Sequence, residues 1–233
     1  MSKNPLKILS GGAVKRGVAQ VAEEFERTTG TPVAVEFATA PEIRKRVAAG
    51  ETADVFVVPP AVMEEFQKQR NIVPESRGLV GRSRVGVVVH AAAAAPPLGD
   101  TAAFKRALLG ATAVVYNTAS SGLYCARLME QLGIVEELKG RIVVVDSGAA
   151  IMEAVASRAP GAIGLAQISE VMVMIEKGCA VRLAAPLPDE IQNMTSYDAA
   201  ASTASKTPEE ARRLAESLRS NAAKKIFAAT GVD

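Results

Sequence analysis

Side chains that commonly bind metals or perform catalysis are scarce in this sequence. Its 233 residues include one histidine, His90, and two cysteines, Cys125 and Cys179, which lie far apart without a CxxC spacing. A structural zinc site needs about four such ligands, and a catalytic triad needs a histidine beside its nucleophile. The carboxylates do not cluster either, so we expect no metal site and assign no catalytic residue.

Glycine-rich nucleotide signatures are also missing. Gly11, Gly12 and Gly17 do not have the GxGxxG spacing of a dinucleotide-binding turn, and no GxxxxGK[ST] loop occurs. Such turns hold phosphate groups with backbone N–H groups, and their absence predicts that the protein has no cofactor.

No charge of one sign dominates, and no long hydrophobic run is present. The 27 basic and 25 acidic residues give a net charge of +2, without a basic stripe interleaved with aromatics, so we expect no nucleic-acid partner. No run approaches the roughly 18 apolar residues of a membrane span, so we expect no membrane insertion. Met1–Pro5 leads straight into an apolar strand, which predicts a cytoplasmic protein as written, or a periplasmic one if a leader has been removed.

Aromatic residues make up 4% of the chain and tryptophan is absent, whereas 48% of the residues are hydrophobic. The cores must therefore consist of Ala, Val, Leu and Ile, which suits parallel strands covered by alanine-rich helices. The two cysteines leave two alternatives open, one disulfide or two free thiols.

Short apolar runs alternate with longer amphipathic ones, which predicts an α/β fold. The expected strands include Leu6–Ser10, Val33–Phe37, Asp54–Val58, Val85–Val89, Ala113–Tyr116, Ile142–Val145 and Ala162–Ala166. Arg77–Arg84 is expected to be a connector. The pattern restarts after it, and Ala185–Tyr197 is expected to return the chain to the first lobe. We predict a discontinuous first lobe of residues 1–82 plus 190–233, a second lobe of residues 83–189, and a ligand cleft between them.

Small and hydroxylic residues follow most of the predicted strands. Helix N-termini at the carboxyl ends of strands present N–H groups that bind anions, so these turns predict a small-anion site. The alternative is that their hydroxyls are ordinary N-caps, each worth about 1 kcal/mol. The candidate ligand-binding residues are Gly11, Gly12, Ala13, Lys15, Thr39, Ala40, Arg44, Ser120, Ser121, Gly122, Gly148 and Gln167.

Positive charge near these turns favours an anionic ligand. Lys15 and Arg16 fall in the first turn of the first predicted helix, where a cation opposes the helix dipole. A purely structural preference would avoid this position, so Lys15 or Arg16 is predicted to contact a carboxylate. Arg44 lies in the next helix, within a basic run that is otherwise typical of a solvated surface.

These turns and their surroundings resemble the molybdate-binding proteins of ABC transporters, which have the type 2 periplasmic binding-protein fold. The resemblance covers almost the whole chain. It rests on Ile8–Ser10 before a helix ending at Phe25–Gly30, on Phe37–Ala40, Ala53–Val57, Ser121–Tyr124 and Glu130–Gly133, and on Ile163-Gly164 before Ser169-Glu170. It implies two lobes, each with a mainly parallel sheet flanked by helices, and a solute bound between them.

The positions that the resemblance assigns to the ligand differ in chemistry. The two serines and the tyrosine of that family fall on Ala13, Ala40 and Gln167, and its backbone contacts fall on Ser121 and Gly148. Each missing hydrogen bond to a charged ligand costs about 1.5–3 kcal/mol, which argues against molybdate. An extended organic anion, met by Lys15 or Arg16 and by Arg44, fits these residues better.

Three functions remain open. The first is a solute-binding protein for a small carboxylate, with a transporter partner if the protein is exported. The second is an isomerase related to the aconitate isomerases of this superfamily, for which Lys15 and Glu42 are the available proton carriers. The third is the sensing domain of a regulator, but the chain has no helix-turn-helix segment of its own.

Overall fold

The computed structural model describes residues 4–158 and 160–233. The chain forms two compact units, which are unit 1 (Met1–Arg82 and Thr195–Asp233) and unit 2 (Ser83–Met194). The chain passes from unit 1 to unit 2 after Arg82 and returns after Met194, where β9 (Met194–Ala201) starts.

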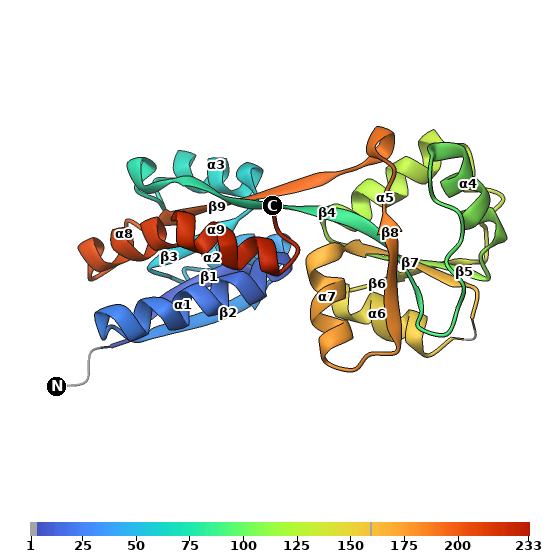
Figure 1. The fold of residues 1–233 in the computed structure, drawn as a ribbon. Coiled ribbons are helices and arrows are strands. Elements are labelled where there is room, and N and C mark those ends of the chain that lie inside the picture. Colours follow the sequence, from blue (N-terminus) through green and yellow to red (C-terminus); the bar gives the residue numbers. More distant parts are fainter. Residues whose placement is uncertain (1–3, 159) are drawn as a thin grey trace. The chain divides into compact units, whose positions relative to one another are not determined.

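Unit 1 contains a sheet with the strand order β2-β1-β3-β9 (Figure 1). β1 (Leu6–Gly11) pairs in parallel with β2 (Val33–Ala38) and with β3 (Val55–Val58). β9 (Met194–Ala201) runs antiparallel to β3, with Val57 opposite Ala199 and Val58 opposite Asp198.

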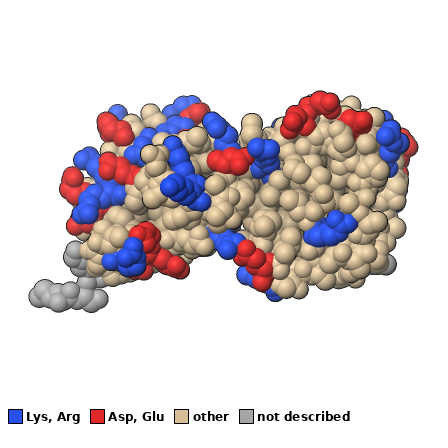
Figure 2. All heavy atoms as spheres, in the orientation of Figure 1, with Lys and Arg blue, Asp and Glu red and all other residues tan. Residues whose placement is uncertain are grey.

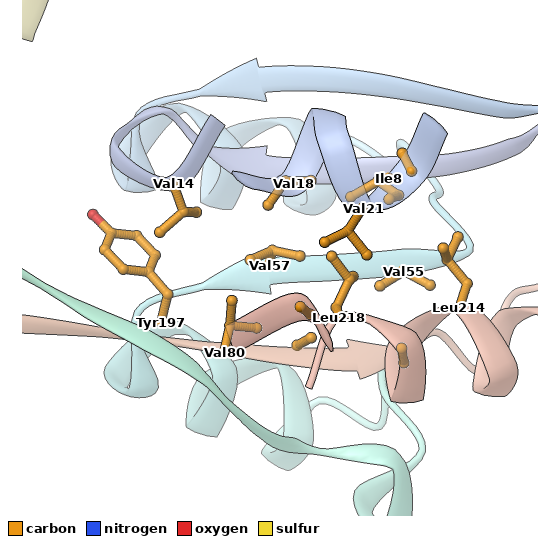
Figure 3. Close-up of a cluster of buried hydrophobic side chains, with 14 of the residues drawn as sticks. Ile8, Val14, Val18, Val21, Val55, Val57, Val80, Tyr197, Leu214 and Leu218 are labelled. Atoms are coloured by element: carbon orange, nitrogen blue, oxygen red, sulfur yellow. The ribbon is translucent and has the colours of Figure 1, made fainter. Parts of the chain in front are cut away.

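Helices cover both faces of the unit 1 sheet. After the 3-10 turn η1 (Gly12–Val14), α1 (Lys15–Thr29) packs with α8 (Pro208–Ser217) and α9 (Asn221–Ala229) on the face that carries Ile8, Val55 and Val57. Figure 3 shows this core, in which Val18 and Val21 of α1 lie with Leu214 and Leu218 around Val55 and Val57. On the other face, α2 (Ala40–Ala48) and α3 (Pro60–Lys68) cover Leu9 and Phe56.

Unit 2 contains a sheet in which β8, β4, β7, β5 and β6 are neighbours in that order. β5 (Ala113–Asn117) is parallel to β6 (Ile142–Val145) and to β7 (Ala162–Gln167). β4 (Gly78–His90) is antiparallel to β7 and to β8 (Val181–Pro186). After β8, the side chain of Gln192 pairs with the backbone of β4. Its Oε1 accepts from the N–H of Val85, and its Nε2 donates to the carbonyl of Val85.

Helices also cover both faces of the unit 2 sheet. α4 (Thr101–Gly110) and α5 (Ser120–Gln131) bury Phe104, Leu108 and Leu128 against one face. α6 (Gly148–Ala156) and α7 (Ile168–Glu176) bury Ile151 and Val171 against the other. The 3-10 turns η2 (Pro74–Ser76) and η3 (Asp189–Ile191) complete the elements described by the structure.

The predicted α/β class with two lobes is confirmed, but one local prediction is wrong. The expected connector Arg77–Arg84 is mostly strand, since β4 starts at Gly78. Within the expected return segment, β9 starts at Met194 and includes Tyr197. α8 starts after Thr207 without a side-chain cap.

Candidate functional site

The carboxyl ends of the parallel strands of unit 1 meet at one edge of its sheet. Ser10 of β1 lies opposite Phe37 of β2 and Val57 of β3, so the three strands end at the same level. The turns that follow them, which hold the predicted residues from Gly11 to Lys15 and from Thr39 to Arg44, therefore lie along this edge. We call it the unit 1 edge.

The first turn at the unit 1 edge is tightly packed. Gly11 and Ala13 are buried, and Gly12 and Lys15 are partly buried. A side chain at Gly11 would lie 2.8 Å from Cε1 of Tyr197, so glycine is needed for this contact. The buried Ser10 hydroxyl donates to the carbonyl of Gly11 at 3.1 Å and so supports the turn.

Tyr197 is a residue of this edge that sequence reasoning did not identify. It comes from β9, one residue before Asp198, which pairs with the last residue of β3. The residue is 5% exposed, its ring lies beside Val14, and its hydroxyl points away from the centre of the core (Figure 3). A strand that runs antiparallel thus brings a phenol to the edge where the parallel strands end.

The second turn at the unit 1 edge contains Thr39, Ala40 and Arg44. Thr39 starts α2 in an extended conformation, but its hydroxyl makes no capping hydrogen bond. Arg44 forms an ion pair within unit 1, in which its Nε and Nη2 donate to the two carboxylate oxygens of Glu65 at 2.7 and 2.8 Å. The arginine lowers the pKa of Glu65 through these hydrogen bonds. A ligand carboxylate would have to compete with Glu65 for this guanidinium.

The parallel strands of unit 2 also end together. Tyr116 and Asn117 of β5 lie opposite Val144 and Val145 of β6, and β7 runs parallel on the other side of β5. The turns at Ser120–Gly122, Gly148 and Gln167 therefore share one edge, which we call the unit 2 edge. The structure thus groups the predicted residues as two sets, one on each unit, and the predicted cleft stays a prediction.

At the start of α5, the backbone of Gly122 lies very close to the backbone of Asn117. A side chain at Gly122 would overlap the backbone carbonyl of Asn117, and the Asn117 side chain accepts a hydrogen bond from the N–H of Ala119 at 3.2 Å. Ser121 is buried and Ser120 is exposed, and neither caps the helix, because the N-cap residue is Ala119 and no side chain makes a capping hydrogen bond. The first N–H groups of α5 are thus left for other partners.

The starts of α6 and α7 face each other at the unit 2 edge. Ser147 caps α6 by accepting the N–H of Ala150 at 3.2 Å. The carboxyl group of Glu170, in the first turn of α7, lies against Gly148, where any side chain would overlap it. Gln167 is buried before α7, and Ser169 contacts Ser83 through their hydroxyl oxygens at 3.0 Å.

Most helix starts at these two edges have no side-chain cap. Within the described residues, five of the six helices that follow parallel strands begin without a side-chain cap, which are α1, α2, α3, α5 and α7. Of the other described helices, α4 and α9 are capped by Asp100 and Ser220, whereas α8 is not capped. The N-cap interpretation of the hydroxyls therefore fails for Thr39 and Ser121, although it holds for Ser147.

Other kinds of site receive no support in the residues that the structure describes. No group of three or more His, Cys, Asp or Glu residues there could hold a metal ion. Among residues 4–158 and 160–233, no helix is both long and apolar enough to cross a membrane. Cys125 and Cys179 are both free thiols, which decides between the two alternatives for the cysteines.

An apolar cavity of about 460 Å³ occurs in unit 2, but at the amino end of β7 rather than at the unit 2 edge. Its lining includes Val89, Ala107 and Ile163, with Arg106 as a charged residue. None of the predicted ligand-binding residues lines it.

Two α/β units with helix starts gathered at the carboxyl edges of their sheets define a binding protein of the type 2 periplasmic class. The chain matches the family described as bacterial extracellular solute-binding protein over residues 6–233. It belongs to that family.

Individual relatives differ in what they bind or convert. An aconitate isomerase from Pseudomonas sp. is 28% identical over 237 residues, covering 97% of this chain and 87% of the relative. The periplasmic molybdate-binding protein of Azotobacter vinelandii has a similar structure, with a TM-score of 0.80 at 18% identity and 98% coverage of each chain. A sulfate-binding protein of Mycobacterium tuberculosis gives a TM-score of 0.77 at 14% identity, covering 98% of this chain and 86% of the other. At these identities the two solved structures support the fold alone.

Proposed function

We propose that this protein binds a small organic carboxylate and that Lys15 is the main cationic contact on unit 1. Lys15 is the first residue of α1 and is partly exposed. In the described part of the chain it forms no ion pair, although the helix dipole disfavours a cation at this position. A bound carboxylate would offset this cost. The proposal depends on this observation of a lysine at a helix start that has no ion pair.

Backbone N–H groups supply the other contacts. The starts of α2 and α5 carry no side-chain cap, and Thr39 and Ser121 add hydroxyl groups beside them. Carboxylates accept hydrogen bonds from such N–H groups, and charge-assisted bonds of this kind are about twice as strong as neutral ones. An extended ligand with two or three carboxylates matches separate groups of donors better than a compact ion does.

The unit 1 edge argues against a tetrahedral oxyanion. Ala13 and Ala40 occupy its two turns and offer no hydroxyl, and Ala13 is buried. A buried dianion needs a hydrogen bond at each oxygen, and each one left unmade costs about 1.5–3 kcal/mol. Molybdate would therefore bind poorly here.

An isomerase is the second candidate function, and the aconitate isomerase relative favours it because the similarity covers 97% of this chain. Moving a double bond within a tricarboxylate requires a group that takes a proton from one carbon and returns it to another. Lys15 is at the unit 1 edge and Glu42 is exposed in the first turn of α2. Proton–deuterium exchange into trans-aconitate, followed by NMR, tests this function, and absence of exchange at high protein concentration would exclude it.

A transporter partner follows from the family, whose members are described as extracellular solute-binding proteins. In that case the protein would deliver its carboxylate to the membrane components of an ABC transporter. Co-purification with such components from membranes would test the partnership.

A thermal-shift screen tests the proposed ligand class. We expect di- and tricarboxylates to raise the melting temperature in a concentration-dependent way, since ligands that bind the native state stabilise it. Sodium chloride at matched ionic strength is the control for general salt effects. A larger shift with molybdate or sulfate than with any carboxylate would overturn the proposal.

A further inference from the structure

The apolar cavity of unit 2 lies away from the unit 2 edge, at the amino end of β7. Its volume is about 460 Å³. Small-molecule sites commonly have volumes of about 300–1,000 Å³ and a mainly apolar lining. Val89 of β4 and Ile163 of β7, which lie opposite each other in the sheet, line the cavity together with Ala107 of α4. The cavity therefore offers an apolar surface that is large enough for a small molecule.

The alanine-rich loop between β4 and α4 forms one wall of the cavity, through Ala92, Ala93, Ala94 and Pro96. Hydrogen bonds hold this loop in place although its side chains are small. The N–H of Ala92 donates to Nδ1 of His90 at 3.1 Å. Nε and Nη2 of Arg182 donate to the carbonyl of Ala93 at 3.2 and 2.6 Å. Protein interiors usually contain few voids, and a wall of alanines that is fixed through its backbone keeps this space open.

Positive charge lies beside the cavity. Within the described part of the chain, Arg106 is the one charged residue that lines it. Arg106 is exposed on α4 and forms no ion pair with any described residue. The last carbonyl groups of a helix disfavour an anion, but Nη1 of Arg141 already donates to those of Leu109 and Ala111, at 2.8 and 2.7 Å. The cavity thus combines an apolar surface with a cationic rim.

We propose that this cavity is a second binding site, which takes a small amphipathic anion with one carboxylate and a short hydrocarbon chain. The chain lies against Val89 and Ile163, because burial of apolar surface is favourable by about 25 cal/mol per Å². The carboxylate stays at the rim and accepts hydrogen bonds from Arg106. The site goes beyond the proposed function, since none of its residues belongs to the turns at the two sheet edges.

Competition against anilinonaphthalene sulfonate, a fluorescent aromatic probe with one negative charge, tests the site. We expect the native protein to bind one probe molecule saturably and octanoate to displace it. Octylamine has a chain of the same length but a positive charge, so it should compete at least tenfold less well. Equal competition by octanoate and octylamine would overturn the inference that the site takes an anion.

Arg106→Gln should weaken octanoate binding at least threefold, a modest loss because water screens an exposed arginine. Arg127→Gln is the matched control, since Arg127 is also exposed on a helix of unit 2 but does not line the cavity. If R106Q and R127Q change octanoate binding equally, the effect is general electrostatics and the inference is wrong.

Filling the cavity is the second test. Ala107→Leu should weaken probe binding at least tenfold, whereas Ala102→Leu, on an exposed position of α4 outside the lining, should leave it unchanged. Gly110→Leu replaces A107L if that variant does not fold, because Gly110 lines the cavity and a side chain there meets nothing within 4 Å. Undiminished probe binding by the filled variant would contradict the inference.

A separate titration keeps this site distinct from the proposed function. Tricarballylate, a saturated tricarboxylate that has no double bond to move, should bind R106Q and A107L as tightly as it binds the wild type. Failure of the wild type to bind tricarballylate would count against the proposed function, whereas failure to bind octanoate would refute the second site.

Discussion

The two units end their parallel strands in the same way but differ in the charged side chains that lie beside the resulting edges. Unit 1 contains 18 basic and 15 acidic residues, and unit 2 contains 9 basic and 10 acidic residues. Figure 2 shows charged side chains spread over the face of unit 1, while the visible face of unit 2 is mainly uncharged. At the edges themselves, unit 1 presents Lys15 and unit 2 presents Glu170.

This difference shows that one architecture can supply two kinds of binding surface. Helix starts offer N–H groups on both units because the strand ends create them. The side chain next to each start then decides which charged group lies there, such as the ammonium group of Lys15 or the carboxylate of Glu170. Arg44 shows a third outcome, since its charge is neutralised by Glu65 within unit 1.

The largest effect is expected on stability, from adding a side chain in the tight turn at the start of α5 in unit 2. Gly122→Ala would force a methyl group into the carbonyl of Asn117, and overpacking against rigid backbone costs about 3 kcal/mol in the free energy of unfolding. Gly110→Ala is the control, because nothing lies near a side chain at that helix end. Urea denaturation measures both variants. A loss below about 1 kcal/mol for G122A would mean that this turn can relax.

Removing the cation of unit 1 should have the next largest effect. Lys15→Ala is expected to weaken tricarballylate binding at least tenfold, because the variant loses a charge-assisted contact at the start of α1. Lys45→Ala, on an exposed position of α2, should leave the affinity unchanged. Calorimetry that finds the two variants alike would remove Lys15 from the site.

Arg44→Ala sharpens the comparison within unit 1. The Glu65 carboxylate already accepts hydrogen bonds from Nε and Nη2 of this guanidinium. We therefore expect the affinity for tricarballylate to fall by less than threefold. A loss as large as that of Lys15→Ala would show that the ligand displaces Glu65, and Glu65→Gln should then tighten binding.

Acid should weaken a surface network of unit 1. Hydrogen bonds from Arg46 and Lys7 lower the pKa of Glu51 from 4.5 to about 2. A lowered folded-state pKa stabilises the protein above the ordinary carboxyl range, and this contribution is lost as the pH falls from about 4.5 towards 2. Glu51→Gln should make thermal stability less dependent on pH in this window. Glu23→Gln, on an exposed position of α1, should behave as the wild type.

The smallest effect concerns the reactivity of the thiols. Burial raises the pKa of Cys125 to about 12, so the native protein should not react with a thiol reagent at this position. Mass spectrometry after alkylation should find Cys125 modified only in denaturant. Rapid modification of the native protein would show that α5 opens locally.

Much of the fold is predictable from the sequence because the strands of both sheets are nearly continuous apolar runs. β4 is the exception. Its first half alternates buried Val80 and Ser83 with exposed Arg82 and Arg84, and the arginines and glycines obscure a strand period. β9 was missed for a related reason, since the small residues after Asp198 carry little strand preference.

The candidate site is predictable in position but not in detail. Strand ends and helix starts follow from local pattern, which is why the turns at Gly11, Ser121 and Gly148 fall at two edges. The pairing of Arg44 with Glu65 depends on how α2 packs beside α3, and the contact of Glu170 with Gly148 depends on how α7 packs beside α6. Such contacts between helices leave no periodic signal in one sequence.

Direct calorimetric titration of the wild-type protein with tricarballylate and with molybdate tests the central claim most directly. Lys15 and the uncapped helix starts predict saturable binding of tricarballylate and at least tenfold weaker binding of molybdate. Tighter binding of molybdate would contradict the account, because the chain would then hold a tetrahedral oxyanion despite Ala13 and Ala40.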